Sequence, residues 1–135
     1  MLTLAPSEPL PITAAEHVVM VRQAVRQRSV ELGFSLVDQT KIVTAASELA
    51  RNTLLHGGGG RALIDVIQDG SRRGLRLTFE DTGPGIADIQ QAMRDGFSTC
   101  GGLGLGLSGA KRLSNEFAIA SAPGAGTRVT ITRWK

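Results

Sequence analysis

Cysteine and histidine are almost missing from this chain of 135 residues, which contains one cysteine and two histidines. The single cysteine, Cys100, excludes an internal disulfide framework. With only His17 and His56 beside it, it also offers too few ligands for a metal cluster. This cysteine usage is typical of a reduced, cytoplasmic protein, and we expect that location here.

Aromatic residues are also scarce, at 4% of the chain, and tyrosine does not occur. The formal net charge of +3 comes from basic residues that are scattered along the sequence. Nucleic-acid-binding proteins instead gather lysine and arginine into a patch or stripe, often together with aromatic side chains. The composition therefore argues against a nucleic-acid partner.

Long apolar runs are absent as well. No stretch reaches the roughly 18 apolar residues that a membrane-spanning helix needs. No basic-then-apolar leader opens the sequence. We therefore expect neither insertion into a membrane nor secretion.

Glycine, in contrast, is abundant: 17 residues without a regular period, clustered at 57–60, 83–85 and 101–109. The chain length and the 41% hydrophobic content predict one domain with an ordinary core. The glycine clusters, which have no regular period, therefore indicate functional loops rather than a fibrous repeat. The last two clusters bracket a segment that begins at the carboxylate of Asp81. Because a bare backbone approaches a ligand closely, this segment predicts a pocket for a flat, polyanionic ligand such as a nucleotide.

Two common phosphate-binding motifs fit the last glycine cluster poorly. Residues 104–109 match G-x-G-x-x-G, but they lack the preceding strand and the acidic residue about 20 positions later that dinucleotide-binding domains require. A P-loop needs lysine directly after its last glycine, whereas Ala110 follows Gly109 here. By itself, the cluster is equally consistent with a flexible loop.

The N-terminal region predicts an arm, a short strand and a helix. Three of the five prolines lie near the N-terminus and disfavour regular structure there, so residues 1–9 are expected to form an irregular arm. Residues 10–13 can form a short edge strand. A helix over residues 14–32 should follow, with Thr13 as its N-cap and Glu16 completing a capping box.

A second helix is predicted over residues 36–56, with Ser35 and Asp38 at its start. At 100° per residue one narrow stripe should face the core, formed by Ile42, Ala46, Leu49 and Thr53. Glu48 and Asn52 lie four positions apart on the flank of this stripe, where a carboxylate and an amide can point into a cleft. The same pair is also consistent with an ordinary polar flank.

The second half of the chain predicts most of the sheet. Residues 75–80 alternate apolar and polar side chains, which is the period of a half-buried strand, and they deliver Asp81 at its C-terminal end. Open α/β layers commonly bind ligands at such strand ends. Residues 86–103 are a candidate lid with a helical turn near its start, and a third helix should begin at Gly104.

The resulting order of elements is β, α, α, β, β, α, β, β. It predicts an α+β fold, a two-layer α/β sandwich in which three helices cover one face of a mixed, mostly antiparallel sheet. We assign this fold to one domain over residues 10–135.

Four motifs follow one another along the chain: Glu48 with Asn52, Asp81-x-Gly83-x-Gly85, Gly102-x-Gly104-x-Gly106, and Thr127 after Gly126. In this order they resemble the N box, the two glycine boxes and the late threonine of the GHKL (Bergerat-fold) ATPases. That family includes gyrase, Hsp90, histidine kinases and MutL. The likeness covers about residues 10–133.

This resemblance implies ATP and Mg²⁺ as cofactors. Asp81 would accept a hydrogen bond from the exocyclic amine of adenine, which guanine cannot donate from its carbonyl. Asn52 would offer an oxygen to Mg²⁺, and Glu48 would act as general base toward the hydroxyl that attacks the γ-phosphate. The implied nucleotide-binding set is Asn52, Asp81, Gly83, Gly85, Ile86, Gly102, Leu103, Gly104, Leu105, Gly106, Leu107 and Thr127.

Within the family, the domain size and the lid residues 95–99 resemble the bacterial anti-sigma and switch-protein serine kinases. The switch kinases of stressosome pathways are the nearest group, and this implies a kinase that phosphorylates a STAS-domain protein. It also implies activation of a PP2C-type phosphatase by binding. Two alternatives stay open: an anti-sigma kinase that also sequesters a sigma factor, and a non-catalytic module that uses ATP as a structural ligand.

Overall fold

The structure is a computed structural model that describes residues 2–5, 9–86, 88–93 and 106–135. The elements in chain order are β1 (Leu2–Ala5), β2 (Leu10–Ile12), α1 (Ala15–Glu31), α2 (Leu36–Leu55), β3 (Gly60–Asp69), β4 (Arg72–Asp81), α3 (Ile89–Ala92), α4 (Gly106–Arg112), β5 (Glu116–Ser121) and β6 (Thr127–Trp134). None of these helices is both long and apolar enough to cross a membrane.

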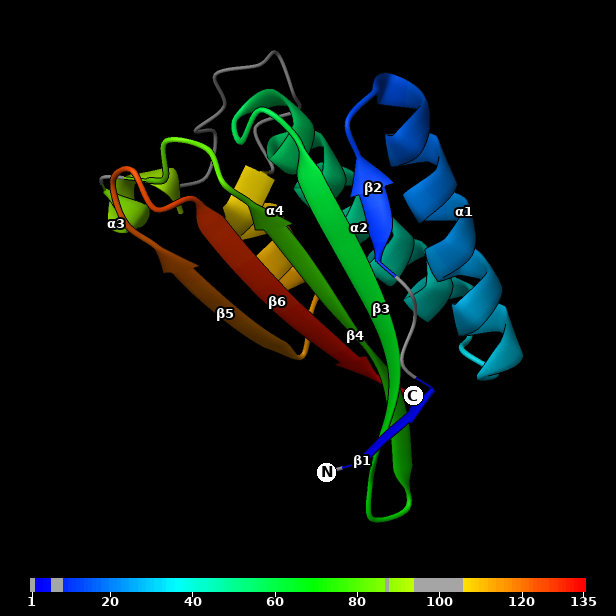
Figure 1. Ribbon diagram of the computed structural model, residues 1–135. Helices are drawn as coiled ribbons and strands as arrows, with labels where there is room; N and C mark the ends of the chain where they lie inside the picture. The colour runs from blue at the N-terminus through cyan, green and yellow to red at the C-terminus, as the bar shows by residue number, and fades with distance from the viewer. Residues whose placement is uncertain (1, 6–8, 87, 94–105) are drawn as a thin grey trace.

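The elements form two layers, as the sequence predicts (Figure 1). One layer is a sheet with strand order β1-β3-β4-β6-β5, to which β2 adds by pairing with β3. All pairings between the described strands are antiparallel. Helices α1, α2 and α4 cover one face of the sheet, and the other face is open toward the viewer in Figure 1. The predicted α+β sandwich is confirmed.

The core between the layers depends on α2. Its predicted stripe is buried, with Ile42, Ala46 and Leu49 at most 1% exposed. These side chains belong to one cluster with Leu77 and Phe79 of β4. Because burying each large apolar side chain stabilises the fold by about 1.5–3 kcal/mol, this contact fixes the rotation of α2 about its axis. It therefore also fixes where the flank of α2 points.

The N-terminal part differs from prediction at two places. Thr13 does not cap α1: the N-cap is Ala14, without a side-chain cap bond, and the amide of Thr13 donates to Nδ1 of His17 at 3.0 Å. The histidine ring thus takes the place of the predicted capping box. Leu2–Ala5, expected to be irregular, form β1 against β3, because the nearby prolines begin only after this segment.

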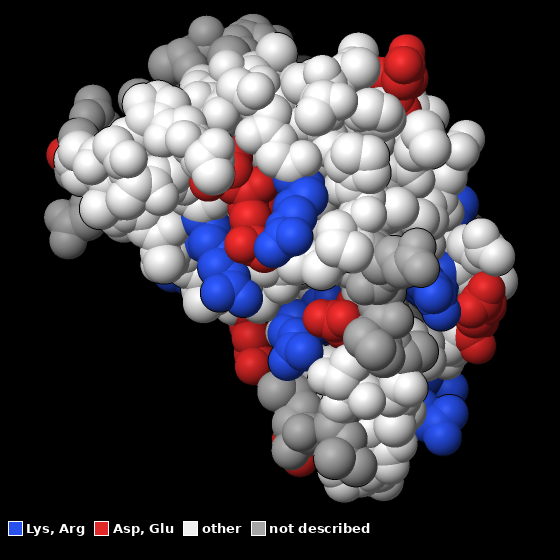
Figure 2. Space-filling model, viewed as in Figure 1, with Lys and Arg blue, Asp and Glu red and all other residues white. Residues whose placement is uncertain are grey.

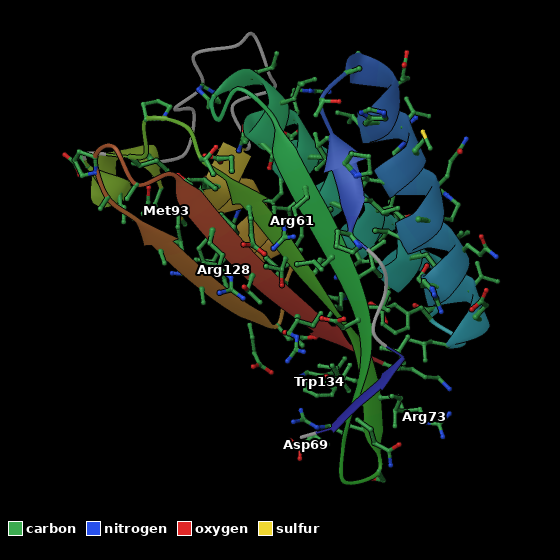
Figure 3. The ribbon with its side chains drawn as sticks, viewed as in Figure 1. Arg61, Asp69, Arg73, Met93, Arg128 and Trp134 are labelled. Carbon is green, nitrogen blue, oxygen red and sulfur yellow. The ribbon has the colours of Figure 1, made fainter. Side chains whose placement is uncertain are left out.

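The open face of the sheet carries interleaved charges (Figure 2). Glu80 of β4 lies between the cross-strand neighbours Arg61 and Arg128, and its carboxylate is 3.6 Å from the Arg61 guanidinium. Asp65 and Arg76 form a second pair at 3.4 Å. Figure 3 shows Arg61 and Arg128 on this face. The Arg61 side chain is exposed, so its pair with Glu80 contributes at most about 1 kcal/mol. These charged side chains make this a solvated face rather than a second core.

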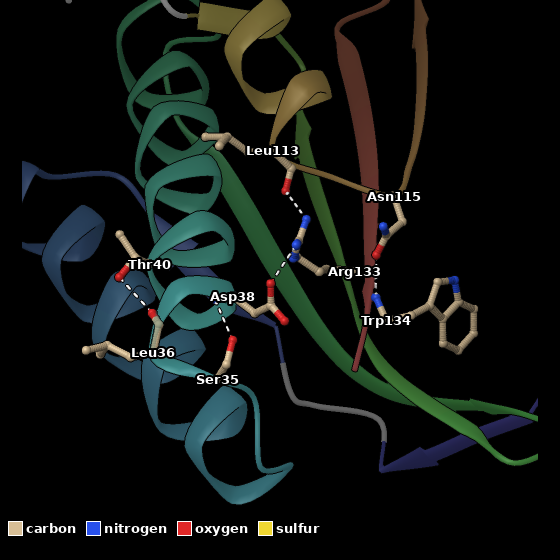
Figure 4. Close-up of polar contacts among 8 residues, drawn as sticks. All are labelled: Ser35, Leu36, Asp38, Thr40, Leu113, Asn115, Arg133 and Trp134. Atoms are coloured by element: carbon tan, nitrogen blue, oxygen red, sulfur yellow. Dashed lines mark hydrogen bonds and ion pairs between the residues drawn. The ribbon is translucent and has the colours of Figure 1, made fainter.

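A half-buried ion pair ties the end of the sheet to α2 (Figure 4). Arg133 of β6 donates to Asp38 in the first turn of α2 at 2.6 Å, and to the carbonyl of Leu113 after α4 at 3.1 Å. Ser35 accepts the amide of Asp38 at 3.1 Å and caps α2 as predicted. The hydrogen bond from Arg133 lowers the pKa of Asp38 below its ordinary value of 3.8, although partial burial opposes this. Arg133 therefore joins both helices to the last strand.

Replacing Asp38 with asparagine should lower the free energy of unfolding near neutral pH by about 1–3 kcal/mol, because Arg133 loses its charged acceptor. A folded-state pKa below the ordinary value adds stability that is present above that value and is lost as pH falls through the lowered pKa. The difference between wild type and Asp38→Asn should therefore shrink below pH 3.8. Urea unfolding followed by the fluorescence of Trp134, the single tryptophan, measures it.

Asp69→Asn is the matched control, because Asp69 also pairs with an arginine, Arg72, at 3.1 Å, but in a turn where both side chains are about half exposed. This substitution should change stability by less than about 0.5 kcal/mol. Equal losses in the two variants would contradict the structural role of the Arg133 bond.

Candidate functional site

Asp81 is the last residue of β4, and its side chain is held in place. Its Oδ1 accepts the backbone amide of Gly83 at 3.0 Å. In the sheet register it stands opposite Gly60 of β3 on one side and Thr127 of β6 on the other. An aspartate that binds the amide two positions on makes a local turn that fixes the carboxylate. The predicted delivery of Asp81 at a strand end is what the structure has.

The loop after Asp81 requires glycine at one position for two reasons. Gly85 has φ of +77°, a backbone conformation that residues with side chains rarely adopt. A Cβ there would also lie 2.8 Å from the carbonyl carbon of Ala122, in the turn between β5 and β6. The same two loops are joined by a hydrogen bond of 2.7 Å from the amide of Gly124 to the carbonyl of Pro84. The first glycine box is therefore packed directly on the β5–β6 turn.

Ser121, at the end of β5, organises this part of the site and was not predicted. Its hydroxyl accepts the amide of Ile86 at 2.8 Å and donates to the carbonyl of Gly126 at 2.9 Å. It also lies 2.8 Å from Oγ1 of Thr127. Because the single proton of Ser121 goes to Gly126, Thr127 is the donor to Ser121. The lone pairs of Thr127 then remain available to a ligand or a water molecule.

Helix α2 brings the predicted carboxylate and amide to the same end of the molecule. Glu48 is 9% exposed, and its carboxylate lies 3.7 Å from the guanidinium of Arg51. Asn52 follows one turn later, and its carbonyl accepts the amides of His56 and Gly57 where the helix ends. In Figure 1 this end of α2 lies beside the start of β3 and the end of β4. Glu48, Asn52 and Asp81 thus belong to neighbouring elements.

The second glycine box is only partly described. Gly106 begins α4, with φ of +40°, and Leu107 is buried in the core. Helix α4 packs against α2. Gly102, Leu103, Gly104 and Leu105, like the lid residues 95–99 and Cys100, lie outside the described residues.

The residues present fit Mg²⁺ only as part of a nucleotide complex. Asn52 offers one hard amide oxygen on α2, a turn away from the carboxylate of Glu48. Mg²⁺ commonly takes one or two protein oxygens and completes its shell with phosphate oxygens and water. Asn52 would hold the ion, which would supply positive charge next to the phosphates.

Comparison with known proteins identifies the family. The family model described as histidine kinase-, DNA gyrase B- and HSP90-like ATPase matches residues 37–135, which include α2, the Asp81 loop and the β5–β6 turn. The chain belongs to this GHKL family. Glu48, Asn52 and Asp81 all lie within the matched residues.

Two relatives cover nearly the whole GHKL chain. The serine/threonine-protein kinase RsbT of Bacillus subtilis is 50% identical over 117 residues, which are 87% of this chain and 88% of RsbT. An anti-sigma F factor of a Thermoanaerobacter species is 28% identical over 128 residues, covering 91% of this chain and 89% of that protein. The chain therefore falls in the anti-sigma and switch-kinase group, with RsbT as its nearer relative of the two.

Solved structures support the fold of this GHKL chain. A crystal structure of the RsbU and RsbW domains of a Mycobacterium tuberculosis protein superposes with a TM-score of 0.62 at 24% identity. The match covers 97% of this chain and 34% of that one. A histidine kinase domain from Erythrobacter litoralis gives a TM-score of 0.53 at 19% identity, covering 91% and 60% of the two chains.

Ser121→Ala tests the hydroxyl network at the site. Without the Ser121 hydroxyl, the amide of Ile86 and the hydroxyl of Thr127 lose their partner, so ATP should bind roughly tenfold more weakly. Calorimetric titration with ATP and Mg²⁺ measures this. Ser114→Ala is the control, because Ser114 also bonds a backbone carbonyl, that of Ala110 at 2.7 Å, but at the far end of α4. A loss of affinity in Ser114→Ala as large as that in Ser121→Ala would contradict the assignment.

Proposed function

We propose that this chain, a serine/threonine kinase of the GHKL type, uses MgATP to phosphorylate a hydroxyl on a STAS-domain protein. The observation that carries the proposal is the position of Glu48. Glu48 is 9% exposed as a whole residue and lies one helical turn from Asn52, on the helix whose end contacts the Asp81 loop. A carboxylate in this position can serve a reaction at the phosphate end of a nucleotide whose base binds at Asp81.

The proposed reaction is a direct transfer. The hydroxyl oxygen of the acceptor attacks the γ-phosphorus as Glu48 accepts the hydroxyl proton, and the bond from that phosphorus to the β–γ bridging oxygen breaks. The products are a phosphate ester on the acceptor and ADP. Catalysis of such transfers rests on positioning and electrostatic stabilisation rather than on covalent chemistry by the protein. Asp81 and Thr127 would hold the base, and Asn52 would hold Mg²⁺ at the phosphates.

Arg51 has a defined place in this scheme. Its guanidinium is 3.7 Å from Glu48, and its side chain is 44% exposed. It can therefore stay paired with the carboxylate while an acceptor approaches, and this pairing restricts the directions in which the proposed general base can point.

The partner assignment rests on similarity. The 50% sequence identity to RsbT over almost the full length of both chains supports an RsbT-like partner switch in the cytoplasm. In that scheme the kinase phosphorylates a STAS scaffold protein of the stressosome type and, once released, activates a PP2C-type phosphatase by binding it.

A second candidate is an anti-sigma kinase, favoured by the 28% identity to anti-sigma F factor over 91% of this chain. The two candidates share the active site and differ only in their partners. Affinity capture with purified STAS, phosphatase and sigma-factor proteins from the same genome separates them. Retention of a sigma factor in the presence of ADP or ATP would favour the anti-sigma function.

Glu48→Gln tests the catalytic assignment with little change in shape. Transfer of radiolabelled γ-phosphate to a purified STAS protein should fall by roughly 10²- to 10⁴-fold, the usual contribution of a general base. ATP affinity, measured by calorimetry, should stay within about threefold, because Glu48 is not assigned to the nucleotide.

Glu80→Gln is the control, since Glu80 is a nearby carboxylate paired with Arg61 on the open face of the sheet. Its transfer rate should match that of wild type. Full activity of Glu48→Gln would remove the general base from the proposal. Failure of wild type to phosphorylate any STAS partner, despite binding ATP, would favour the non-catalytic module.

A further inference from the structure

Gly57 lies directly behind the carboxylate of Asp81. It follows His56, the C-cap of α2, and its amide donates to the carbonyl of Asn52 at 3.2 Å. A Cβ on Gly57 would stand 2.5 Å from both Cβ and Oδ2 of Asp81. Real Cβ atoms essentially never approach other atoms closer than 3.0 Å. The position of the Asp81 side chain is therefore compatible only with glycine at position 57.

The same residue also contacts the first glycine box. A Cβ on Gly83 would lie 2.5 Å from the carbonyl oxygen of Gly57 and 2.8 Å from its Cα. The side chain of Asp81 thus lies against the backbone of Gly57 and accepts a hydrogen bond from the amide of Gly83. Any group added at position 57 would push the carboxylate out of this position, and the hydrogen bond to Gly83 would break.

We propose that Gly57 is a specificity-determining residue of the nucleotide site. By lacking a side chain, it lets Asp81 keep the one orientation in which the carboxylate can accept a hydrogen bond from the 6-amino group of adenine. The inference rests on the proposed binding of ATP at Asp81. It adds a residue of the 57–60 glycine cluster to the site, through a contact of the α2 terminus.

The position also connects the two ends of the nucleotide. The Gly57 amide donates to the backbone carbonyl of Asn52, the proposed Mg²⁺ ligand, and the Gly57 backbone packs on Asp81, the proposed adenine acceptor. The short segment after α2 therefore joins the backbone of the helix end that carries Asn52 to the side chain of Asp81. Because binding sites gain affinity from preorganisation, a side chain at position 57 that displaces Asp81 should weaken recognition of the base although Asn52 and Asp81 are both still present.

Gly58 provides a matched control for this position. It has φ of +73°, and a Cβ on it would meet nothing within 4 Å, whereas Gly57 has no positive φ and a crowded Cβ position. Alanine at Gly58 therefore strains the backbone but leaves Asp81 untouched. Alanine at Gly57 needs no strained backbone conformation, but its Cβ collides with the side chain of Asp81.

The test compares the affinities of wild type, Gly57→Ala and Gly58→Ala for ATP and for GTP by calorimetry with Mg²⁺. Gly57→Ala should bind ATP at least roughly tenfold more weakly, and its preference for ATP over GTP should collapse, because the lost contact is one that only adenine makes. Gly58→Ala should lower the melting temperature but keep the ATP-to-GTP preference of wild type. An unchanged preference in Gly57→Ala, or an equal loss in Gly58→Ala, overturns the inference.

A second measurement covers the case in which Gly57→Ala is too unstable to titrate. In an Asp81→Gly background the clashing side chain is gone, so adding Gly57→Ala should leave the melting temperature nearly unchanged. If Gly57→Ala lowers the melting temperature equally in the wild-type and Asp81→Gly backgrounds, the inference is overturned, because the clash is then not with Asp81.

The outcomes also separate this inference from the proposed function. A wild-type protein that does not prefer ATP to GTP refutes adenine recognition by Asp81, whatever position 57 does. A selective wild type with an equally selective Gly57→Ala refutes only the role of Gly57.

Discussion

The hydrogen bond from the Gly83 amide to the Asp81 carboxylate is the interaction on which the rest of the site depends. It turns a side chain at a strand end, which could otherwise rotate in solvent, into an acceptor with a fixed direction. The sheet register places Asp81 between Gly60 and Thr127, and the absence of a side chain at Gly57 leaves space for the Asp81 carboxylate. A recognition group fixed before the ligand arrives loses less conformational entropy on binding.

Helix α2 carries the proposed chemistry to that carboxylate. Its apolar stripe is locked on the sheet, so the flank that bears Glu48 and Asn52 has one orientation, and its last turn ends against Asp81. A protein catalyses phosphoryl transfer mainly by positioning the reacting groups and by stabilising the charge on the phosphate oxygens. A helix fixed at its start by Ser35 and the Asp38–Arg133 pair, and at its end by the Gly57 contact, meets that demand with few residues.

Sequence reasoning found what local patterns encode and missed what only the folded chain brings together. The stripe of α2, the Ser35 cap and the arrival of Asp81 at a strand end follow from periodicity and turn chemistry, and the structure has all three. The roles of Ser121 and Gly57 could not be predicted, because each depends on a contact with a residue more than twenty positions away: Ser121 with Ile86, and Gly57 with Asp81. Thr13 was misjudged because the His17 ring competes for the amide that a capping box would use.

The most direct test of adenine recognition by Asp81 is a calorimetric comparison, on the wild-type chain with Mg²⁺, of ATP with purine riboside triphosphate, which lacks only the 6-amino group. We predict that the analogue binds at least roughly tenfold more weakly, because the Asp81 carboxylate loses the hydrogen bond from the ligand and keeps only the one from the Gly83 amide. Equal affinities for the two triphosphates would contradict it.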